Sequence, residues 1–158
     1  MGCFTVIKEC SQNTETATSV IPKPVSVKIL KDSVTLQIFS HILIHPDTPE
    51  TRFIADEIKT LLSPAIDIEI APNIQKGKGR IELNINSKVS ENKEGYNLSI
   101  FSKRILIEAP SAAGLFYGFQ SLRQLLPPEL EKGIEPQSPT IPCVEIEDYP
   151  RFGYRGMH

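Results

Sequence analysis

Short segments in which apolar and polar residues alternate are the feature that most restricts how this chain can fold. Such alternation is typical of β-strands that bury only one of their two faces. The loops between the segments are short, which favours antiparallel neighbours because a parallel return needs a crossover of about a dozen residues. The alternating segments are residues 25–29, 34–38, 66–70, 80–85, 96–100 and 104–108.

The first two of these segments predict a β-hairpin. They are joined by Lys31, Asp32 and Ser33, three polar residues that suit a turn. Residues 41–44 continue the second strand or add another one before Pro46 stops it.

Residues 49–63 follow the helical period instead, with Asp47 or Thr48 as the N-cap. Apolar side chains recur there at intervals of three and four residues, and charged side chains occupy the other face. The predicted apolar stripe consists of Phe53, Ile54, Ile58, Leu61 and Leu62.

A second helix is predicted over residues 111–126, from Ser111 as the N-cap to a stop at Pro127. Gly114 and Gly118 are four residues apart, so one face of this helix can approach a sheet closely. Its apolar stripe consists of Leu115, Phe116, Phe119, Leu122, Leu125 and Leu126. The sequence therefore predicts an α+β fold, with a mainly antiparallel sheet and two helices packed on one face.

Composition limits the chain to one domain of ordinary character. It has 158 residues, of which 40% are hydrophobic, enough to bury one core. The 17 basic and 19 acidic residues nearly cancel and are interspersed, which excludes the basic surface that a nucleic acid partner requires. No apolar run approaches the roughly 20 residues of a membrane-spanning helix, so no transmembrane segment is predicted.

Residues that carry chemistry in other proteins are scattered here. Gly77-Lys78-Gly79 lacks the spacing of a phosphate-binding loop and predicts a hairpin turn. Three acidic residues near the end of the chain resemble the paired carboxylates of glycosidases, but they are interpreted as a solvated strand face. The sequence therefore predicts no catalytic residue, no metal site and no cofactor. The residues considered were His41, His45, His158, Cys3, Cys10, Cys143, Glu145, Glu147 and Asp148.

The amino-terminal residues have the composition of a tether. Residues 11–19 are rich in Ser, Thr, Asn, Gln and Glu, which is typical of disorder. Residues 1–7 are more apolar but are followed at once by Lys8 and Glu9, so they are read either as the remnant of an export signal or as an altered start.

Two segments resemble the leading domain of glycoside hydrolase family 20, of the kind found in chitobiases and hexosaminidases. Residues 109–126, APSAAGLFYGFQSLRQLL, are similar to the last helix of that domain, and residues 146–158, IEDYPRFGYRGMH, to the hinge into the family's (β/α)8 barrel. This resemblance divides the chain into a disordered leader (1–19), the α+β domain (20–146) and the hinge with the start of the first barrel strand (147–158).

The resemblance implies the function of a longer parent protein. Such a parent is a β-N-acetylhexosaminidase that removes terminal non-reducing N-acetyl-D-hexosamine from glycans by a retaining, substrate-assisted mechanism. It needs no cofactor, and its catalytic Asp-Glu pair lies in the barrel, so the present chain alone is predicted to be inactive. Arg155 matches the arginine that binds hydroxyls of the terminal sugar, whereas Arg151 is expected to be a structural or solvent-facing arginine at the domain junction.

The resemblance also implies where the domain acts and what it contacts. The domain is expected to pack on the barrel of its own chain, and the parent is expected to be exported to the periplasm, the cell surface or the medium of a bacterium. Two alternatives stay open. One is a self-standing carbohydrate-binding or interaction domain that uses an exposed sheet face, although the chain has no Trp and only four Tyr for stacking on sugars. The other is the equivalent domain of a different barrel glycosidase.

Overall fold

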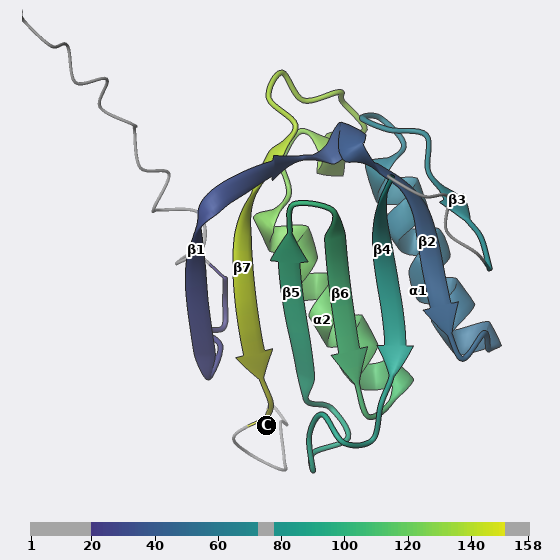
Figure 1. The fold of residues 1–158 in the computed structure, drawn as a ribbon, viewed down its shortest axis with the longest axis vertical. Coiled ribbons are helices and arrows are strands. Elements are labelled where there is room, and N and C mark those ends of the chain that lie inside the picture. The colour runs from purple at the N-terminus through teal and green to yellow at the C-terminus, as the bar shows by residue number, and fades with distance from the viewer. Residues whose placement is uncertain (1–19, 73–77, 151–158) are drawn as a thin grey trace, which may run out of the picture.

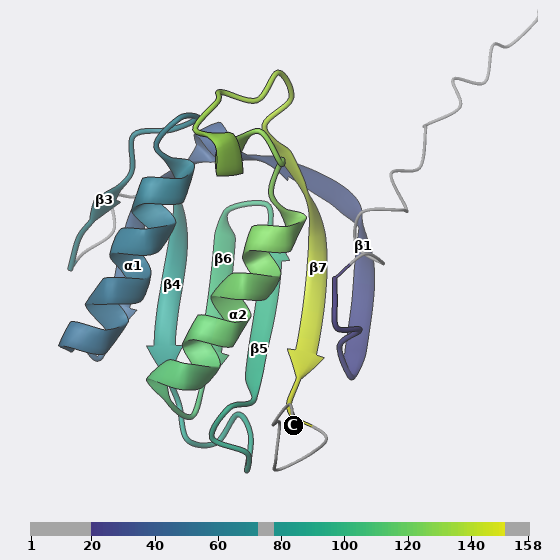
Figure 2. The same cartoon turned by 180° about the vertical axis from the view of Figure 1, so that it is seen from behind.

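The computed structural model of the chain describes residues 20–72 and 78–150. Seven strands form one sheet in the order β1-β7-β5-β6-β4-β2-β3, and two helices lie on the same face of it (Figures 1 and 2). This arrangement confirms the predicted α+β class with two helices on one face. The elements in chain order are β1 (Ser26–Thr35), β2 (Phe39–His45), α1 (Pro49–Leu62), β3 (Glu69–Ile70), β4 (Gly79–Ile85), β5 (Tyr96–Phe101), β6 (Arg104–Ala109), α2 (Ala112–Leu125) and β7 (Thr140–Asp148), with short 3-10 helices at Leu36–Ile38 and Leu130–Lys132.

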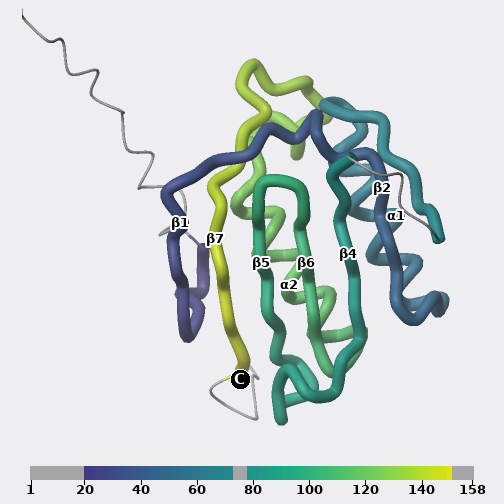
Figure 3. Tube along the Cα trace, in the orientation of Figure 1, coloured from purple at the N-terminus to yellow at the C-terminus, as the bar shows by residue number. Residues whose placement is uncertain are grey.

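The sheet is mixed, and the two kinds of pairing occupy different halves. β1, β7, β5 and β6 pair antiparallel, and of these only β5 and β6 are joined by the kind of short loop that predicted such pairing. β6, β4, β2 and β3 pair in parallel. α1 carries the chain back across the sheet after β2 (Figure 3), and β5, which runs antiparallel to β6, carries it back between β4 and β6. The antiparallel expectation therefore does not extend to this second half.

The hairpin predicted from residues 25–29 and 34–38 is wrong. Residues 26–35 form one continuous strand, β1, which pairs with β7 at residues 26–29 and again at residues 33–35. The predicted turn at Lys31–Ser33 is a bulge, since Ile29 lies opposite Val144 while Ser33 lies opposite Pro142. A β-bulge adds residues to one strand of a pair and bends that strand without reversing its direction. The polar residues that predicted a turn therefore form a bend within an edge strand.

Both helices begin at the caps that their sequences indicate. Thr48 accepts a hydrogen bond from the Thr51 amide at 3.3 Å, and the Thr51 hydroxyl accepts one from the Thr48 amide at 2.9 Å. This reciprocal pair satisfies two amide groups that the first turn of a helix leaves unpaired. Ser111 caps α2 through a single hydrogen bond, which its hydroxyl accepts from the Gly114 amide at 3.3 Å.

The core lies between the sheet and the helices. α2 approaches the sheet closely at its two glycines: a Cβ on Gly118 would lie 2.5 Å from Cγ2 of Ile107, and a Cβ on Gly114 would lie 2.4 Å from the carbonyl oxygen of Gly95. The strand residues in register with Ile107 point to the same face and are fully buried there. The close approach predicted from the glycine spacing is therefore confirmed.

The two ends of the described region meet beside α2. β7 continues to Asp148, two residues beyond the predicted end of the domain at Ile146. Asp148 accepts a hydrogen bond from the Val25 amide at 3.2 Å. The side-chain amide of Gln124 accepts one from the Ile21 amide at 2.7 Å and donates one to the Ile21 carbonyl at 3.0 Å. These contacts fix the entry of the chain against its exit.

Candidate functional site

The one substrate-binding residue that the sequence nominates cannot be placed in the fold. Arg155 lies outside the residues that the structure describes, as do Arg151, His158, Cys3 and Cys10. Arg155 therefore stays a prediction.

The described histidines and cysteine have structural surroundings. His41 and His45 both lie on β2, where His41 is buried and its Nδ1 lies 2.7 Å from the Ser40 hydroxyl. Cys143 is buried in β7, and burial together with the charge of Asp32 raises the pKa of its thiol, so the thiol stays protonated. Within residues 20–72 and 78–150, no three His, Cys, Asp or Glu side chains gather as a metal site would require.

The carboxylates near the end of the chain belong to the strand face, as interpreted from the sequence. Glu145 pairs with Lys28 across the sheet at 2.9 Å, Glu147 is exposed, and Asp148 holds the entry segment. Glu145 and Glu147 thus belong to the solvated face of the strand.

The sheet face opposite the helices carries charges that pair with one another. Glu82 lies between Arg80 and Arg104, with 2.5 Å between its Oε2 and a terminal nitrogen of Arg104. Burial alone raises the pKa of Glu82, but the hydrogen bonds and charges of the two arginines outweigh it and lower the pKa. Phe101, at the end of β5, is the large exposed aromatic residue on this face in the described region. Among the residues that the structure describes, this face therefore lacks the aromatic platform that a sheet-face sugar site needs.

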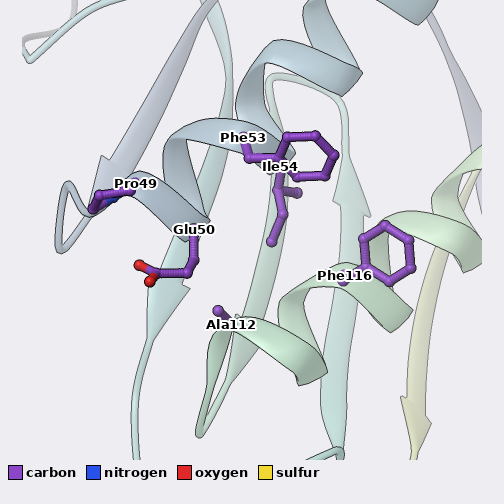
Figure 4. A pocket seen from close by; sticks show the side chains of 6 residues that line it. All are labelled: Pro49, Glu50, Phe53, Ile54, Ala112 and Phe116. Atoms are coloured by element: carbon purple, nitrogen blue, oxygen red, sulfur yellow. The ribbon is translucent and has the colours of Figure 1, made fainter.

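A shallow apolar groove lies between the two helices on the outer side of the molecule. It has a volume of about 470 Å3, and its side chains come from the first two turns of α1 and α2 (Figure 4). The rings of Phe53 and Phe116 stand on the two facing helices. The lining of this helix groove is Pro49, Glu50, Phe53, Ile54, Ala112 and Phe116.

Two residues of the predicted apolar stripes are exposed at this groove. Phe53 is 57% exposed and Phe116 is 38% exposed, whereas their neighbours Ile54 and Leu115 are buried. Each phenylalanine lies at the edge of its stripe, one position round the helix from the residue that reaches the sheet. The sequence placed both in the core, and the structure shows that they form an apolar outer surface.

A second hollow lies where the chain enters and leaves the domain. It has a volume of about 170 Å3 and is lined by residues from the entry segment, from β5, from α2 and from the end of β7. At its base the hydroxyl groups of Tyr96 and Ser121 are hydrogen-bonded and buried. Burial raises the pKa of Tyr96 to about 12, with a smaller contribution from the charge of Asp148. We call this hollow the tyrosine pocket, because Tyr117 and Tyr149 flank it.

Nothing in the sequence indicated that the tyrosines of this pocket lie close together in the fold. Tyr117 lies on α2 and Tyr149 follows β7, and both line one hollow because β7 pairs with β5 beneath the helix.

Neither helix in the described part of the chain has the length and apolar character needed to span a bilayer.

Comparison with known proteins identifies the family. Residues 17–149 match the family model described as glycosyl hydrolase family 20, domain 2. A β-hexosaminidase of Porphyromonas gingivalis is 30% identical over 166 residues, a match that covers 98% of this chain and 21% of that protein. The chain thus spans about a fifth of the length of this relative. The match selects family 20 over the other barrel glycosidases.

Solved structures agree with this assignment. An N-acetyl-β-hexosaminidase of Streptomyces plicatus, solved in complex with Thio-NAglucal, aligns with a TM-score of 0.74 and 34% identity, covering 86% of this chain and 27% of that one. An exo-β-N-acetylglucosaminidase of Vibrio harveyi has the same fold at 24% identity, with a TM-score of 0.66 over 88% of this chain and 20% of that one. Because the family model matches residues 17–149, which are most of this chain, the chain belongs to glycoside hydrolase family 20, within which it corresponds to domain 2.

Proposed function

We propose that this chain is the amino-terminal accessory domain of a β-N-acetylhexosaminidase whose catalytic residues lie in a barrel that follows it. The observation that carries the proposal is the family match over residues 17–149, together with similarity to β-hexosaminidases that are several times longer. The parent would remove terminal non-reducing N-acetyl-D-hexosamine from glycans. The 2-acetamido group of the substrate would act as the nucleophile, and an Asp-Glu pair in the barrel would orient it and move the proton.

The helix groove supports an accessory role for the domain. Phe53 and Phe116 are both exposed and line the same groove between the two helices, and adjoining exposed apolar side chains favour contact with a partner surface. We assign the barrel of the same chain to this surface, because Pro150, the last residue that the structure describes, lines a hollow with residues of α2, one of the two helices that form the groove. In this arrangement the groove supplies apolar contacts and the hinge supplies the covalent connection.

Arg155 is proposed to bind hydroxyl groups of the terminal sugar. A guanidinium presents a rigid fork of N–H donors, which suits two adjacent hydroxyls of one sugar ring. The residue follows the described end of the domain by only a few positions, so a docked domain would hold the start of the first barrel strand in place.

Hydrolysis of an aryl N-acetyl-β-glucosaminide tests this proposal. Three proteins are compared: the 158-residue chain, the parent extended through the barrel, and the extended parent with Arg155→Ala. We expect activity only in the extended parent, and a loss of about 100-fold or more in kcat/KM in the variant, because an interaction with a charged donor is removed from the sugar site.

Each other outcome has a distinct meaning. Activity in the 158-residue chain would overturn the assignment of catalysis to the barrel. Full activity of the Arg155→Ala parent would overturn the role of Arg155 alone. An Arg151→Ala parent is the matched control. This nearby arginine is assigned no sugar contact, so the variant enzyme should keep most of its activity.

We also propose that the parent is exported. The proposal rests on the tether-like composition of residues 11–19 and on the location of glycan substrates outside the cytoplasm. Fractionation of the source cells checks it, with hexosaminidase activity expected in the periplasmic, surface or medium fraction. Activity confined to the cytoplasmic fraction would contradict it.

A further inference from the structure

The tyrosine pocket is lined by side-chain types that bind sugars in other proteins. Its two flanking tyrosines come from different parts of the chain, and both residues are partly exposed, Tyr117 to 38% and Tyr149 to 41%. Tyrosine combines a flat apolar ring with a polar tip, so it can stack on the C–H face of a pyranose while its hydroxyl stays hydrated. The volume of about 170 Å3 is below the usual range for drug-sized ligands and suits a single ring.

Hydrogen-bonding groups surround the same hollow. Glu94 adds a carboxylate and Gln120 adds an amide, a pair that offers both acceptors and donors to vicinal hydroxyls. Asp148 uses one carboxylate oxygen for the Val25 amide, which leaves its second oxygen for another donor. The pocket therefore combines an apolar flank with planar polar groups, as specific small-molecule sites do.

The pocket is also preformed. Gln124 is held by two hydrogen bonds to the backbone of Ile21, and the hydroxyls of Tyr96 and Ser121 are hydrogen-bonded beneath it. A lining that is already fixed loses little conformational entropy when a ligand binds.

Charge selects among sugars. The lining contains the carboxylates of Glu94 and Asp148 and no Lys or Arg side chain among the described residues. A negative pocket repels phosphate, sulfate and uronic acid groups, so a neutral sugar is favoured.

We propose that the tyrosine pocket binds one neutral pyranose unit of a glycan. The sugar class follows from the lining of the pocket, and only the choice of N-acetylglucosamine as the probe rests on the proposed function. The affinity is expected to be low, with a Kd on the order of 1 mM, because a monosaccharide has few atoms with which to offset the loss of its own freedom.

Titration of the 158-residue chain, followed by two-dimensional amide NMR, tests the proposal. N-acetylglucosamine should cause saturable shifts centred on the amides of Tyr117, Gln120 and Tyr149. Tyr149→Ala and Tyr117→Ala should each weaken binding by about 5-fold or more, because each removes one stacking ring. Phe101→Ala is the matched control: it removes an exposed ring from the opposite face and should leave the Kd unchanged.

Two further probes make the test decisive. Glucuronic acid should bind more weakly than N-acetylglucosamine, since it adds a negative charge. Tighter binding of glucosamine than of N-acetylglucosamine would identify a cation site and overturn the proposal, as would the absence of saturable shifts in a chain whose spectrum is well dispersed. An inactive extended parent would contradict the proposed function but would leave this result unaffected.

Discussion

Glu82 illustrates how one residue organises a sheet face. Its carboxylate accepts hydrogen bonds from Arg80 and Arg104, and its side chain is only 13% exposed. Because the folded-state pKa is lowered, the group stabilises the fold above its unfolded value of 4.5, and this contribution is lost as the pH falls through the folded-state pKa.

Glu82→Gln should therefore lower the free energy of unfolding at neutral pH by roughly 1–2 kcal/mol, since it removes two charge-assisted hydrogen bonds that are partly screened by solvent. The difference from the wild-type chain should shrink as the pH falls below 4.5 and through the lower folded-state pKa, because the wild-type carboxyl then becomes neutral, first in the unfolded chain and then in the folded one. Urea unfolding at a series of pH values measures both effects.

Glu145→Gln is the matched control for this measurement, because it removes the carboxylate of an exposed pair with Lys28. Exposed pairs contribute little to stability, so this variant should follow the wild-type curve. A constant difference between Glu82→Gln and the wild type at all pH values would contradict the assignment.

The roles of some residues could be predicted from the sequence, and those of others could not. The glycines of α2 and the caps Thr48 and Ser111 were predictable, because each acts on its own helix or through its lack of a side chain. The exposure of Phe53 was not, since the helical period gives the direction of a stripe without its width.

At the scale of elements, the contact between α2 and the sheet depends on the absence of a side chain. Gly114 lies near the start of the helix, and the atoms that a Cβ would meet are the carbonyl oxygen of Gly95 at 2.4 Å and Cβ of Ala109 at 2.8 Å. Neither atom can rotate away, so the helix would have to shift.

Gly114→Ala should accordingly lower the free energy of unfolding by about 1–3 kcal/mol, although alanine is the better helix former. Chemical denaturation measures the change. Ala113→Ser, at the adjacent exposed position, should change stability by less than about 0.5 kcal/mol. A stabilised Gly114→Ala chain would mean that α2 stands further from the sheet than described.

The existence of most elements was predictable from the sequence, but their pairing was only partly so. Alternation located β1, β3, β4, β5 and β6, and the helical period located both helices, because periodicity is a local property. Alternation also placed residues 34–38 in a strand, whereas residues 36–38 form a 3-10 helix, and it did not indicate β7. The parallel pairing of β2 with β4 was missed, since it depends on α1 packing across the sheet. The same limit hid the tyrosine pocket, because its lining comes from four separate segments.

At the scale of the whole molecule, the helix groove predicts how the domain behaves in its parent. Phe53→Asp in the extended parent should place a charge in the apolar contact and weaken docking, which would lower the temperature at which activity is lost. Thermal inactivation measures this effect.

Phe101→Asp in the extended parent is the control, since it introduces the same charge at an exposed aromatic residue on the opposite sheet face. It should leave the inactivation temperature near that of the unmodified parent. Equal effects of the two substitutions would contradict docking through the helix groove.

The pairing of β1 with β7 has a consequence for protein synthesis. β1 is among the first parts of the domain to leave the ribosome, but its neighbour in the sheet is the last strand, and Val25 and Asp148, which are hydrogen-bonded, are 123 residues apart. At a translation rate of about 5–20 residues per second, β1 waits roughly 6–25 s for that neighbour. During this interval its backbone edge is open to chaperones and to other nascent chains, and it becomes protected only when the end of β7 has emerged.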